Sequence, residues 1–185
     1  MTALNDTNLL LDHSREIRLR NGTSIFLGSY RASKSWKALR EANVDAIVNI
    51  TTNVPNSFPN HFDYYTLRLP DWADAPLLQH LDEVTAFIHR HIANQKNVLV
   101  HCCRGTSRSV AVLWAYLVRY DEDRRFAASL LGKVNPGLLQ QVHLYQEHRC
   151  GSEDDCAQAD VLSCEADKLN NAVSLGSTAE QPVVS

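Results

Sequence analysis

The segment from Val98 to Val110 contains residue types that can carry out phosphoryl chemistry. Cys102 is followed six residues later by Arg108, with Gly105 midway between them. An apolar run precedes the cysteine and an apolar run with helical character follows the arginine, which predicts a strand, a tight loop and a helix. In such a loop the backbone N–H groups of residues 103–108 can point inward. Together with the helix dipole they would bind a doubly charged anion.

Cys102 is therefore a candidate nucleophile. The field that binds an anion also lowers the pKa of a thiol, so Cys102 can be a thiolate near neutral pH and attack a bound phosphate. A cysteine and an arginine at this spacing also occur together by chance, and a buried cysteine after a strand is usually a small core residue. The apolar run before the cysteine, Gly105, Ser109 and the long apolar helix after it favour the catalytic interpretation.

Cleavage of a phosphate monoester also needs a general acid that protonates the leaving oxygen. The segment 69–76 offers two carboxylates, Asp71 and Asp74, between Pro70 and Pro76. It falls between a predicted strand and a predicted helix, where a loop can bring an acid to a bound phosphate. Both carboxylates are candidates on these grounds.

The hydrophobic pattern predicts the elements that would position these residues. Strands are expected at 17–20 and 25–27 as a hairpin and at 46–50, 62–69 and 98–100. Helices are expected at 33–42, 77–93, 110–120, 123–134 and 136–149, with Ser33 or Ser35, Asp123 and Pro136 at helix starts. Strands that alternate with helices predict an α/β fold, with a central, mostly parallel, twisted sheet of about five strands flanked by helices. Loops that bind ligands lie at the carboxyl ends of such strands.

The composition predicts one folded domain, since the chain has 185 residues and 44% of them are hydrophobic. The net charge of −3 is unevenly distributed, because residues 151–185 contain seven acidic residues and a single basic one, Lys168. The rest is mildly positive, which suits an anionic substrate and does not predict nucleic-acid binding. We expect a flexible N-terminus at 1–15, a folded domain at 16–149 and an acidic, disordered tail at 150–185.

The five cysteines do not fit a disulfide framework, because their number is odd and Cys102 and Cys103 are adjacent. No Cys-x-x-Cys pair is present, so a zinc site is not expected. We expect no other metal and no cofactor. The N-terminal residues lack the pattern of a signal peptide, and no apolar run approaches membrane-spanning length. We therefore expect a cytoplasmic location, with the nucleus as an alternative and no membrane partner.

The signature His101-Cys102, then Arg108-Ser109 after five residues, resembles the dual-specificity branch of the protein tyrosine phosphatases. Three further segments resemble elements of that family: Ile25–Tyr30, Leu39–Ile50 and Asn135–Val142. Asn43 and Leu138 stand where the family usually has glycine and phenylalanine. The resemblance covers about residues 16–149 and implies a phosphatase-like fold of the small, atypical kind.

The resemblance implies a role for each signature residue. Cys102 would form a phosphocysteine, and Arg108 would bind two phosphate oxygens with its planar guanidinium. Ser109 would donate a hydrogen bond to Cys102 and help it leave, and His101 would orient the loop from behind. The phosphate would be bound by the loop residues Cys103, Arg104, Gly105, Thr106, Ser107 and Arg108.

The resemblance also favours Asp71 over Asp74 as the general acid, because Asp71 precedes Cys102 by 31 residues, as is usual in this branch. Cys103 and Arg104 depart from the family's usual small or varied residues. Cys103 is either a redox partner of Cys102 or a reduced bystander, since a disulfide between adjacent cysteines is strained. Arg104 either recruits acidic substrates or is a solvated charge at the rim.

The implied function is metal-independent hydrolysis of phosphotyrosine and of phosphoserine or phosphothreonine in proteins. The expected partners are phosphorylated protein substrates, which include protein kinases as candidates. The alternatives are a phosphoinositide, an RNA 5′ phosphate or a phosphorylated glycan as substrate, a phosphate-binding pseudophosphatase, and sulfur transfer on a similar loop. The loop has only Arg104 besides Arg108, fewer basic residues than lipid-directed members generally have. The oligomeric state is left open.

Overall fold

The structure is a computed structural model that describes residues 14–120 and 124–149. The predicted acidic tail, residues 1–13 of the predicted flexible N-terminus and the predicted helix start Asp123 lie outside the described residues. The first strand begins at Ser14, two residues before the predicted start of the folded domain.

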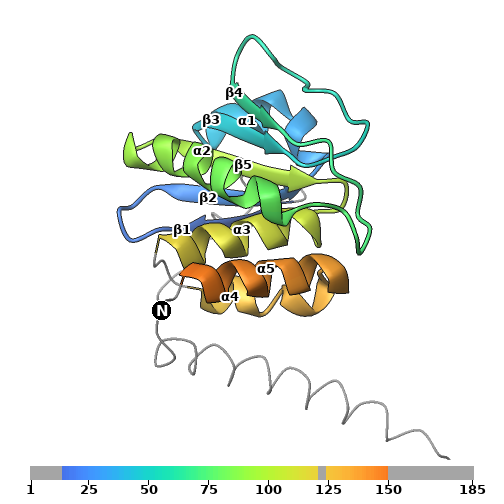
Figure 1. The fold of residues 1–185 in the computed structure, drawn as a ribbon. Coiled ribbons are helices and arrows are strands. Elements are labelled where there is room, and N and C mark those ends of the chain that lie inside the picture. The colour runs from blue at the N-terminus through green and yellow to red at the C-terminus, as the bar shows by residue number, and fades with distance from the viewer. Residues whose placement is uncertain (1–13, 121–123, 150–185) are drawn as a thin grey trace, which may run out of the picture. The chain divides into compact units, whose positions relative to one another are not determined.

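A five-stranded mixed sheet forms the centre of the fold (Figure 1). Its strands, in the spatial order β1-β2-β5-β3-β4, are β1 (Ser14–Arg18), β2 (Ser24–Ser29), β5 (Asn97–Cys102), β3 (Val44–Asn49) and β4 (Asp63–Thr66). Only β1 runs antiparallel to its neighbour, and the other pairs are parallel. The predicted α/β class with a mostly parallel sheet of about five strands is confirmed.

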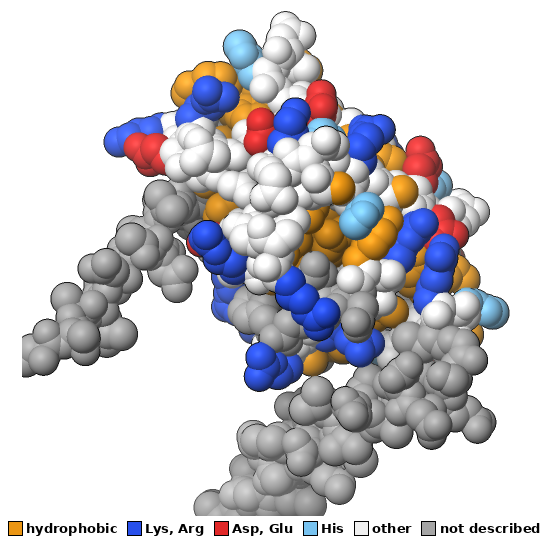
Figure 2. Space-filling model, turned by 90° about the vertical axis from the view of Figure 1, so that its left-hand side faces the viewer, with side chains coloured by type: hydrophobic (Ala, Val, Ile, Leu, Met, Phe, Trp, Pro, Cys, Tyr) orange, Lys and Arg blue, Asp and Glu red, His pale blue; other side chains and the backbone are white. Residues whose placement is uncertain are grey.

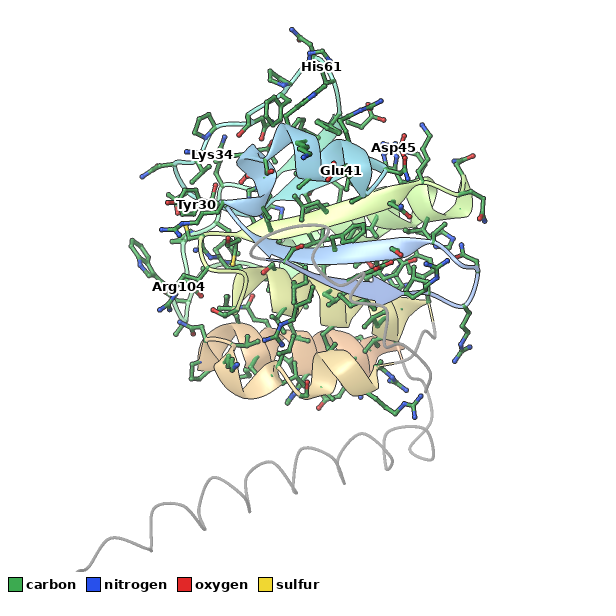
Figure 3. All side chains as sticks on the ribbon, turned by 180° about the vertical axis from the view of Figure 1, so that it is seen from behind. Tyr30, Lys34, Glu41, Asp45, His61 and Arg104 are labelled. Carbon is green, nitrogen blue, oxygen red and sulfur yellow. The ribbon has the colours of Figure 1, made fainter. Side chains whose placement is uncertain are left out.

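Helices cover both faces of this sheet. They are α1 (Trp36–Glu41), α2 (Leu81–Ala93), α3 (Arg108–Arg119), α4 (Arg125–Ala128) and α5 (Pro136–Arg149). α1 lies on one face, whereas α2 and α3 lie on the other, and α5 packs on the outer side of α3 (Figures 1 and 3). α3 is apolar nearly all round because it is buried between the sheet and α5.

The burial of β5 explains its continuous apolar sequence. Val98, Leu99 and Val100 are fully buried, as expected for a central parallel strand covered on both faces. Successive side chains of a strand point to opposite faces. The face under α1 holds one core cluster, made by Phe26, Ala32, Leu39, Ala42, Val44, Ile47, Phe62 and Leu99. β5 is therefore buried on both faces up to its last residue, Cys102.

The predicted start of the first helix at Ser33 is wrong, whereas the alternative, Ser35, occupies the N-cap position. The helix predicted at 33–42 begins only at Trp36, after a 3-10 turn at Ala32–Lys34. Ser35 stands at the N-cap position without a side-chain capping hydrogen bond, and the Ser33 hydroxyl donates instead to the carbonyl of Tyr30. The hydroxyl of Ser33 thus stabilises the preceding turn rather than the helix.

The single helix predicted at 123–134 is also wrong, because the structure has the short α4 and a separate 3-10 turn at Leu131–Lys133. Gly132 lies in that turn, and glycine is less favourable than alanine in a helix by about 1 kcal/mol. The helix predicted at 77–93 is present as α2, preceded by a 3-10 turn at Leu78–His80. Within the described ranges, no helix has the length and apolar character needed to cross a membrane.

Candidate active site

The signature loop joins the end of β5 at Cys102 to the start of α3 at Arg108. Gly105 at its tip has φ +75°, a left-handed conformation that favours glycine. A Cβ there would lie 2.8 Å from the carbonyl carbon and oxygen of Gly28, so no side chain fits between the loop and the end of β2. Glycine at this position therefore lets the loop curl tightly against the sheet.

The curled loop places hydrogen-bond donors around the Cys102 thiol, which is 1% exposed. The Gly105 N–H donates to Cys102 Sγ over 3.2 Å, and Ser109 Oγ lies 3.3 Å from Sγ. Burial raises the pKa of the Cys102 thiol, but the Ser109 hydroxyl and the N–H groups of Ser109, Ser107 and Gly105 outweigh it. The pKa of Cys102 therefore lies below its ordinary value. A thiolate at this position is stabilised by hydrogen bonds from its own loop.

His101 lies under the loop and is 1% exposed. Burial lowers the pKa of His101 to about 4, against a smaller opposing effect of a hydrogen bond with the Cys102 backbone. The imidazole is therefore neutral at neutral pH and supplies no positive charge to the thiolate. Any effect of His101 on the loop comes from packing and hydrogen bonding.

The Arg108 side chain is 5% exposed and reaches across the loop toward the segment that follows β4. Its Nη1 donates to the carbonyl of Leu69 over 2.8 Å, which fixes one side of the guanidinium. Its Nε is buried without a hydrogen-bond partner. A buried, unpaired donor on a permanent cation is costly unless an anion takes its hydrogen bond, which makes this edge suitable for phosphate oxygens.

The loop between β4 and α2, hereafter the acid loop (residues 69–76), runs past the end of β5 (Figure 1). Ser107 Oγ of the signature loop donates to Asp71 Oδ1 over 2.7 Å, and Arg108 Nε lies 3.8 Å from Asp71 Oδ2. Asp74 is exposed and has no such contact with the described residues. The structure thus brings Asp71, and not Asp74, to the signature loop.

The N-terminal part of α5 holds the acid loop, which the sequence did not predict. Asn135 Nδ2 donates to the Asp71 carbonyl over 3.0 Å, and its N–H donates to Ser107 Oγ over 3.0 Å. Gln141 Nε2 donates to the Ala75 carbonyl over 2.9 Å, and its Oε1 accepts from the Leu78 N–H over 2.9 Å. The amide side chains of Asn135, immediately before α5, and of Gln141 in α5 therefore bind backbone groups of the acid loop and of Leu78.

The two residues that depart from the family pattern lie on the outer side of the signature loop. Cys103 is half-buried, and its carbonyl accepts a hydrogen bond from the Tyr30 N–H over 3.4 Å. Cys102 and Cys103 are both free thiols. Arg104 is exposed and lies at the same end of the molecule as Tyr30 (Figure 3).

The arrangement as a whole can bind a tetrahedral dianion, attack it and protonate what leaves. Inward N–H groups and Arg108 surround the position in front of Cys102, and Asp71 faces it from another segment. Within the part of the chain that the structure describes, no three His, Cys, Asp or Glu side chains group closely enough to hold a metal ion.

Comparison with known proteins agrees with this geometry. The family model for the dual specificity phosphatase catalytic domain matches residues 25–145. Human protein phosphatase Slingshot homolog 3 is 33% identical over 145 residues, which are 75% of this chain and 22% of the relative. Mouse dual specificity protein phosphatase 19 is 31% identical over 129 residues, which are 66% of this chain and 59% of the relative. The chain thus spans less than two thirds of the length of either relative.

Solved structures show the same fold. A crystal structure of human DUSP28 has a TM-score of 0.62 and 29% identity, covering 70% of this chain and 93% of that chain. The crystal structure of DUSP15 has a TM-score of 0.60 at 24% identity and covers 74% of this chain. Since the family model matches most of the chain, and the strand, loop and helix of its signature are in place, the chain belongs to the dual specificity phosphatase family.

Proposed function

We propose that the chain hydrolyses phosphotyrosine and phosphoserine or phosphothreonine in proteins, without a metal, through a phosphocysteine at Cys102. The observation that carries this proposal is the hydrogen bond between Asp71 and Ser107. It holds a carboxyl group against the loop that surrounds the buried, activated thiol. A nucleophile and an acid then face one anion site, as the displacement requires.

In the first step Cys102 Sγ attacks phosphorus. The S–P bond forms while the bond from phosphorus to the substrate oxygen breaks. Asp71, in its protonated form, gives its proton to that oxygen, so the product leaves as a neutral alcohol or phenol. The loop N–H groups and Arg108 bind the three remaining phosphate oxygens, whose charge they stabilise in the transition state.

In the second step water breaks the phosphocysteine. Asp71, now a carboxylate, accepts a proton from a water molecule whose oxygen attacks phosphorus. The S–P bond breaks and Cys102 leaves as a thiolate, which the Ser109 hydroxyl and the Gly105 N–H stabilise. Inorganic phosphate is released, and Asp71 carries a proton again for the next cycle.

Protein substrates are favoured over phosphoinositides because the signature loop carries one exposed cation, Arg104, besides the buried Arg108. A pseudophosphatase or a sulfurtransferase would not require Cys102, Arg108 and Asp71 together. Phosphorylated proteins, kinases among them, are thus the proposed partners. A reducing compartment, the cytoplasm or the nucleus, is part of the proposal because the thiolate has to stay reduced.

Hydrolysis of p-nitrophenyl phosphate in the presence of a chelator tests the chemistry. Cys102→Ser should abolish turnover, and Asp71→Asn should lower kcat by about 10²- to 10⁴-fold, the usual contribution of general acid–base catalysis. Asp74→Asn is the matched control and should keep its activity. Mass spectrometry after acid quenching should find phosphate on Cys102. Full activity of Cys102→Ser, or an equal loss in Asp74→Asn, would contradict the mechanism.

The substrate class is tested separately with wild-type protein. Turnover is compared on phosphotyrosine and phosphothreonine peptides, a phosphoinositide, RNA with a 5′ triphosphate and a phosphorylated glycan. The proposal expects the highest kcat/KM on the peptides. A higher kcat/KM on the lipid, the RNA or the glycan would assign the same chemistry to that substrate instead.

A further inference from the structure

Ser107 stands at the N-cap position of α3 but does not cap the helix. A serine at this position ordinarily accepts a hydrogen bond from an N–H group of the first turn. Ser107 makes no such bond. Its hydroxyl lies instead 2.7 Å from Asp71 Oδ1 of the acid loop. The side chain of Ser107 therefore serves a contact outside α3, which its place in the sequence does not reveal.

The partners of Ser107 Oγ fix the direction of its hydroxyl proton. The Asn135 N–H donates to Oγ over 3.0 Å, and a backbone N–H can only donate. Oγ accepts in that bond, so its single proton is left for another partner. Ser107 is 4% exposed, and within residues 14–120 and 124–149 its hydroxyl reaches one acceptor, Asp71 Oδ1. The hydroxyl proton therefore points to Asp71 Oδ1.

This hydrogen bond gives the two oxygens of the Asp71 carboxyl group different tasks. If Oδ1 carried the carboxyl proton and donated it to Ser107 Oγ, the hydroxyl proton of Ser107 would be buried without an acceptor, which is unfavourable. The carboxyl proton therefore belongs on Oδ2. Oδ2 lies 3.8 Å from Arg108 Nε, the buried donor without a hydrogen-bond partner at the edge suited to phosphate oxygens.

We propose that Ser107 is a positioning residue that places the proton of the general acid on Oδ2 of Asp71, the oxygen beside the phosphate-binding edge of Arg108. The inference rests on the proposed function and deepens it, because it assigns the oxygen that transfers the proton. Ser107 acts through Asp71 and exchanges no proton with the substrate.

The same hydrogen bond suits both steps of the reaction. In the first step the Oδ2–H bond breaks, the proton passes to the leaving oxygen, and Asp71 becomes a carboxylate. Oδ1 keeps the hydrogen bond from Ser107, which is stronger to a charged acceptor and so stabilises the carboxylate as it forms. In the second step Oδ2 accepts a proton from the attacking water. Neither step requires the Ser107 hydroxyl to turn.

The hydrolysis of phenyl phosphate tests the proposal, because its leaving oxygen needs the proton. Ser107→Ala removes the hydroxyl, and Ser107→Thr keeps one. Asp71→Asn, alone and combined with Ser107→Ala, shows whether Ser107 acts through the acid. The measured quantity is kcat/KM, which reports the first step.

Ser24→Ala is the matched control. Ser24 is 3% exposed, and its hydroxyl also donates to a carboxylate, that of Glu16. It begins β2, at the end of the sheet opposite Cys102. Figure 2 views that side of the molecule, where basic and acidic side chains stand close together. The variant therefore removes the same kind of hydrogen bond at a distance from the site.

Ser107→Ala should lower kcat/KM for phenyl phosphate by about tenfold, as expected for the loss of one hydrogen bond. The loss should shrink to about twofold for 2,4-dinitrophenyl phosphate, whose leaving group needs no proton. Ser107→Thr should return to within about threefold of wild type, since a hydroxyl is again present. In the Asp71→Asn protein, Ser107→Ala should change kcat/KM by less than about twofold, because no acid is left to position. Ser24→Ala should keep the wild-type value.

A tenfold loss from Ser107→Ala that persists in the Asp71→Asn protein would overturn the proposal, because Ser107 would then act on the loop itself. Wild-type kcat/KM in Ser107→Ala, or an equal loss in Ser24→Ala, would overturn it as well.

Infrared spectroscopy tests the hydrogen bond without turnover. If the wild-type protein hydrolyses no aryl phosphate, the proposed function fails, and Ser107 is then examined in acid-minus-neutral difference spectra. The carbonyl stretch of protonated Asp71, identified by its loss in Asp71→Asn, should move to higher frequency in Ser107→Ala. A hydrogen bond accepted by the carbonyl oxygen lowers this frequency, and the bond is made only if the proton is on the other oxygen, Oδ2. An unchanged frequency would refute the assignment.

Discussion

A methyl group at position 137 should separate the general acid from the rest of the active site. An ideal Cβ on Gly137 would lie 2.0 Å from the Ala73 carbonyl oxygen and 2.4 Å from its Cα, whereas real Cβ contacts are essentially never shorter than 3.0 Å. Both are backbone atoms and cannot rotate away. Gly137→Ala therefore requires the acid loop and the first turn of α5 to separate by about 1 Å.

That separation reaches Asp71, two residues before Ala73. Its 2.7 Å hydrogen bond to Ser107 cannot be kept across a displacement of this size. A misplacement of about 1 Å costs on the order of 10²-fold in rate. We expect Gly137→Ala to lower kcat by about that factor for phenyl phosphate, whose leaving group needs the proton most. The loss should be smaller for p-nitrophenyl phosphate.

The assay pairs this variant with Gly132→Ala. No heavy atom lies within 4 Å of an ideal Cβ at Gly132, so the same chemical change there displaces nothing. Alkylation of Cys102 should proceed at the wild-type rate in both variants, because the hydrogen bonds of that thiol come from the signature loop. Folding is checked by thermal unfolding. A folded Gly137→Ala protein with the kcat of Gly132→Ala would refute the reasoning.

Three further outcomes follow from burial and hydrogen bonding. Iodoacetamide should alkylate Cys102 with a pH midpoint below that of a free cysteine, and Ser109→Ala should raise that midpoint by removing a donor to the thiolate; an unchanged midpoint would contradict the assignment. Burial lowers the pKa of His101 to about 4 in the folded state, so the unfolded state, whose pKa is near 6.5, binds the proton more tightly. The free energy of unfolding should therefore fall by up to about 1.4 kcal/mol per pH unit as pH falls from about 6.5 to about 4 in urea unfolding. His101→Gln should flatten this profile. Leu99→Ala should cost about 2–5 kcal/mol in the same assay because the side chain is fully buried, whereas Leu144→Ala, 38% exposed, should stay within about 0.5 kcal/mol.

The signature loop was predictable because its parts are adjacent in the sequence. An apolar strand, Gly105 and an apolar helix specify a strand, loop and helix within a dozen residues, and the structure contains them. The helix boundaries were less predictable. The hydrophobic period of 77–93 continues through the 3-10 turn at Leu78–His80, so the period alone does not show where α2 begins.

The choice of acid and the residues that hold it depend on distant parts of the chain. Asp71 and Asp74 occupy similar sequence surroundings, so the residues alone left both as candidates, and the family resemblance favoured Asp71. In the structure the contact with Ser107, 36 residues later, separates them. Asn135 and Gln141 contact backbone groups more than 60 residues away, which no local pattern records. Locally, the sequence shows only that two amide side chains, Asn135 and Gln141, lie near the start of a helix. That pattern does not predict which backbone groups they bind.

The role of α5 follows from a difference between the two halves of the site. Cys102 and Arg108 belong to a strand and a helix, whose regular hydrogen bonds fix them. Asp71 lies on a loop outside the regular helices and strands, and Asn135 and Gln141 of the α5 segment add hydrogen bonds to the carbonyls of Asp71 and Ala75. Because α5 packs on α3, which starts at Arg108, the helix that holds the acid is tied to the helix that holds the phosphate ligand. The packing of α5 on α3 therefore helps to set the spacing of acid and nucleophile, together with the direct contact of Ser107 with Asp71. A change that loosens this packing should lower turnover of poor leaving groups before it unfolds the protein.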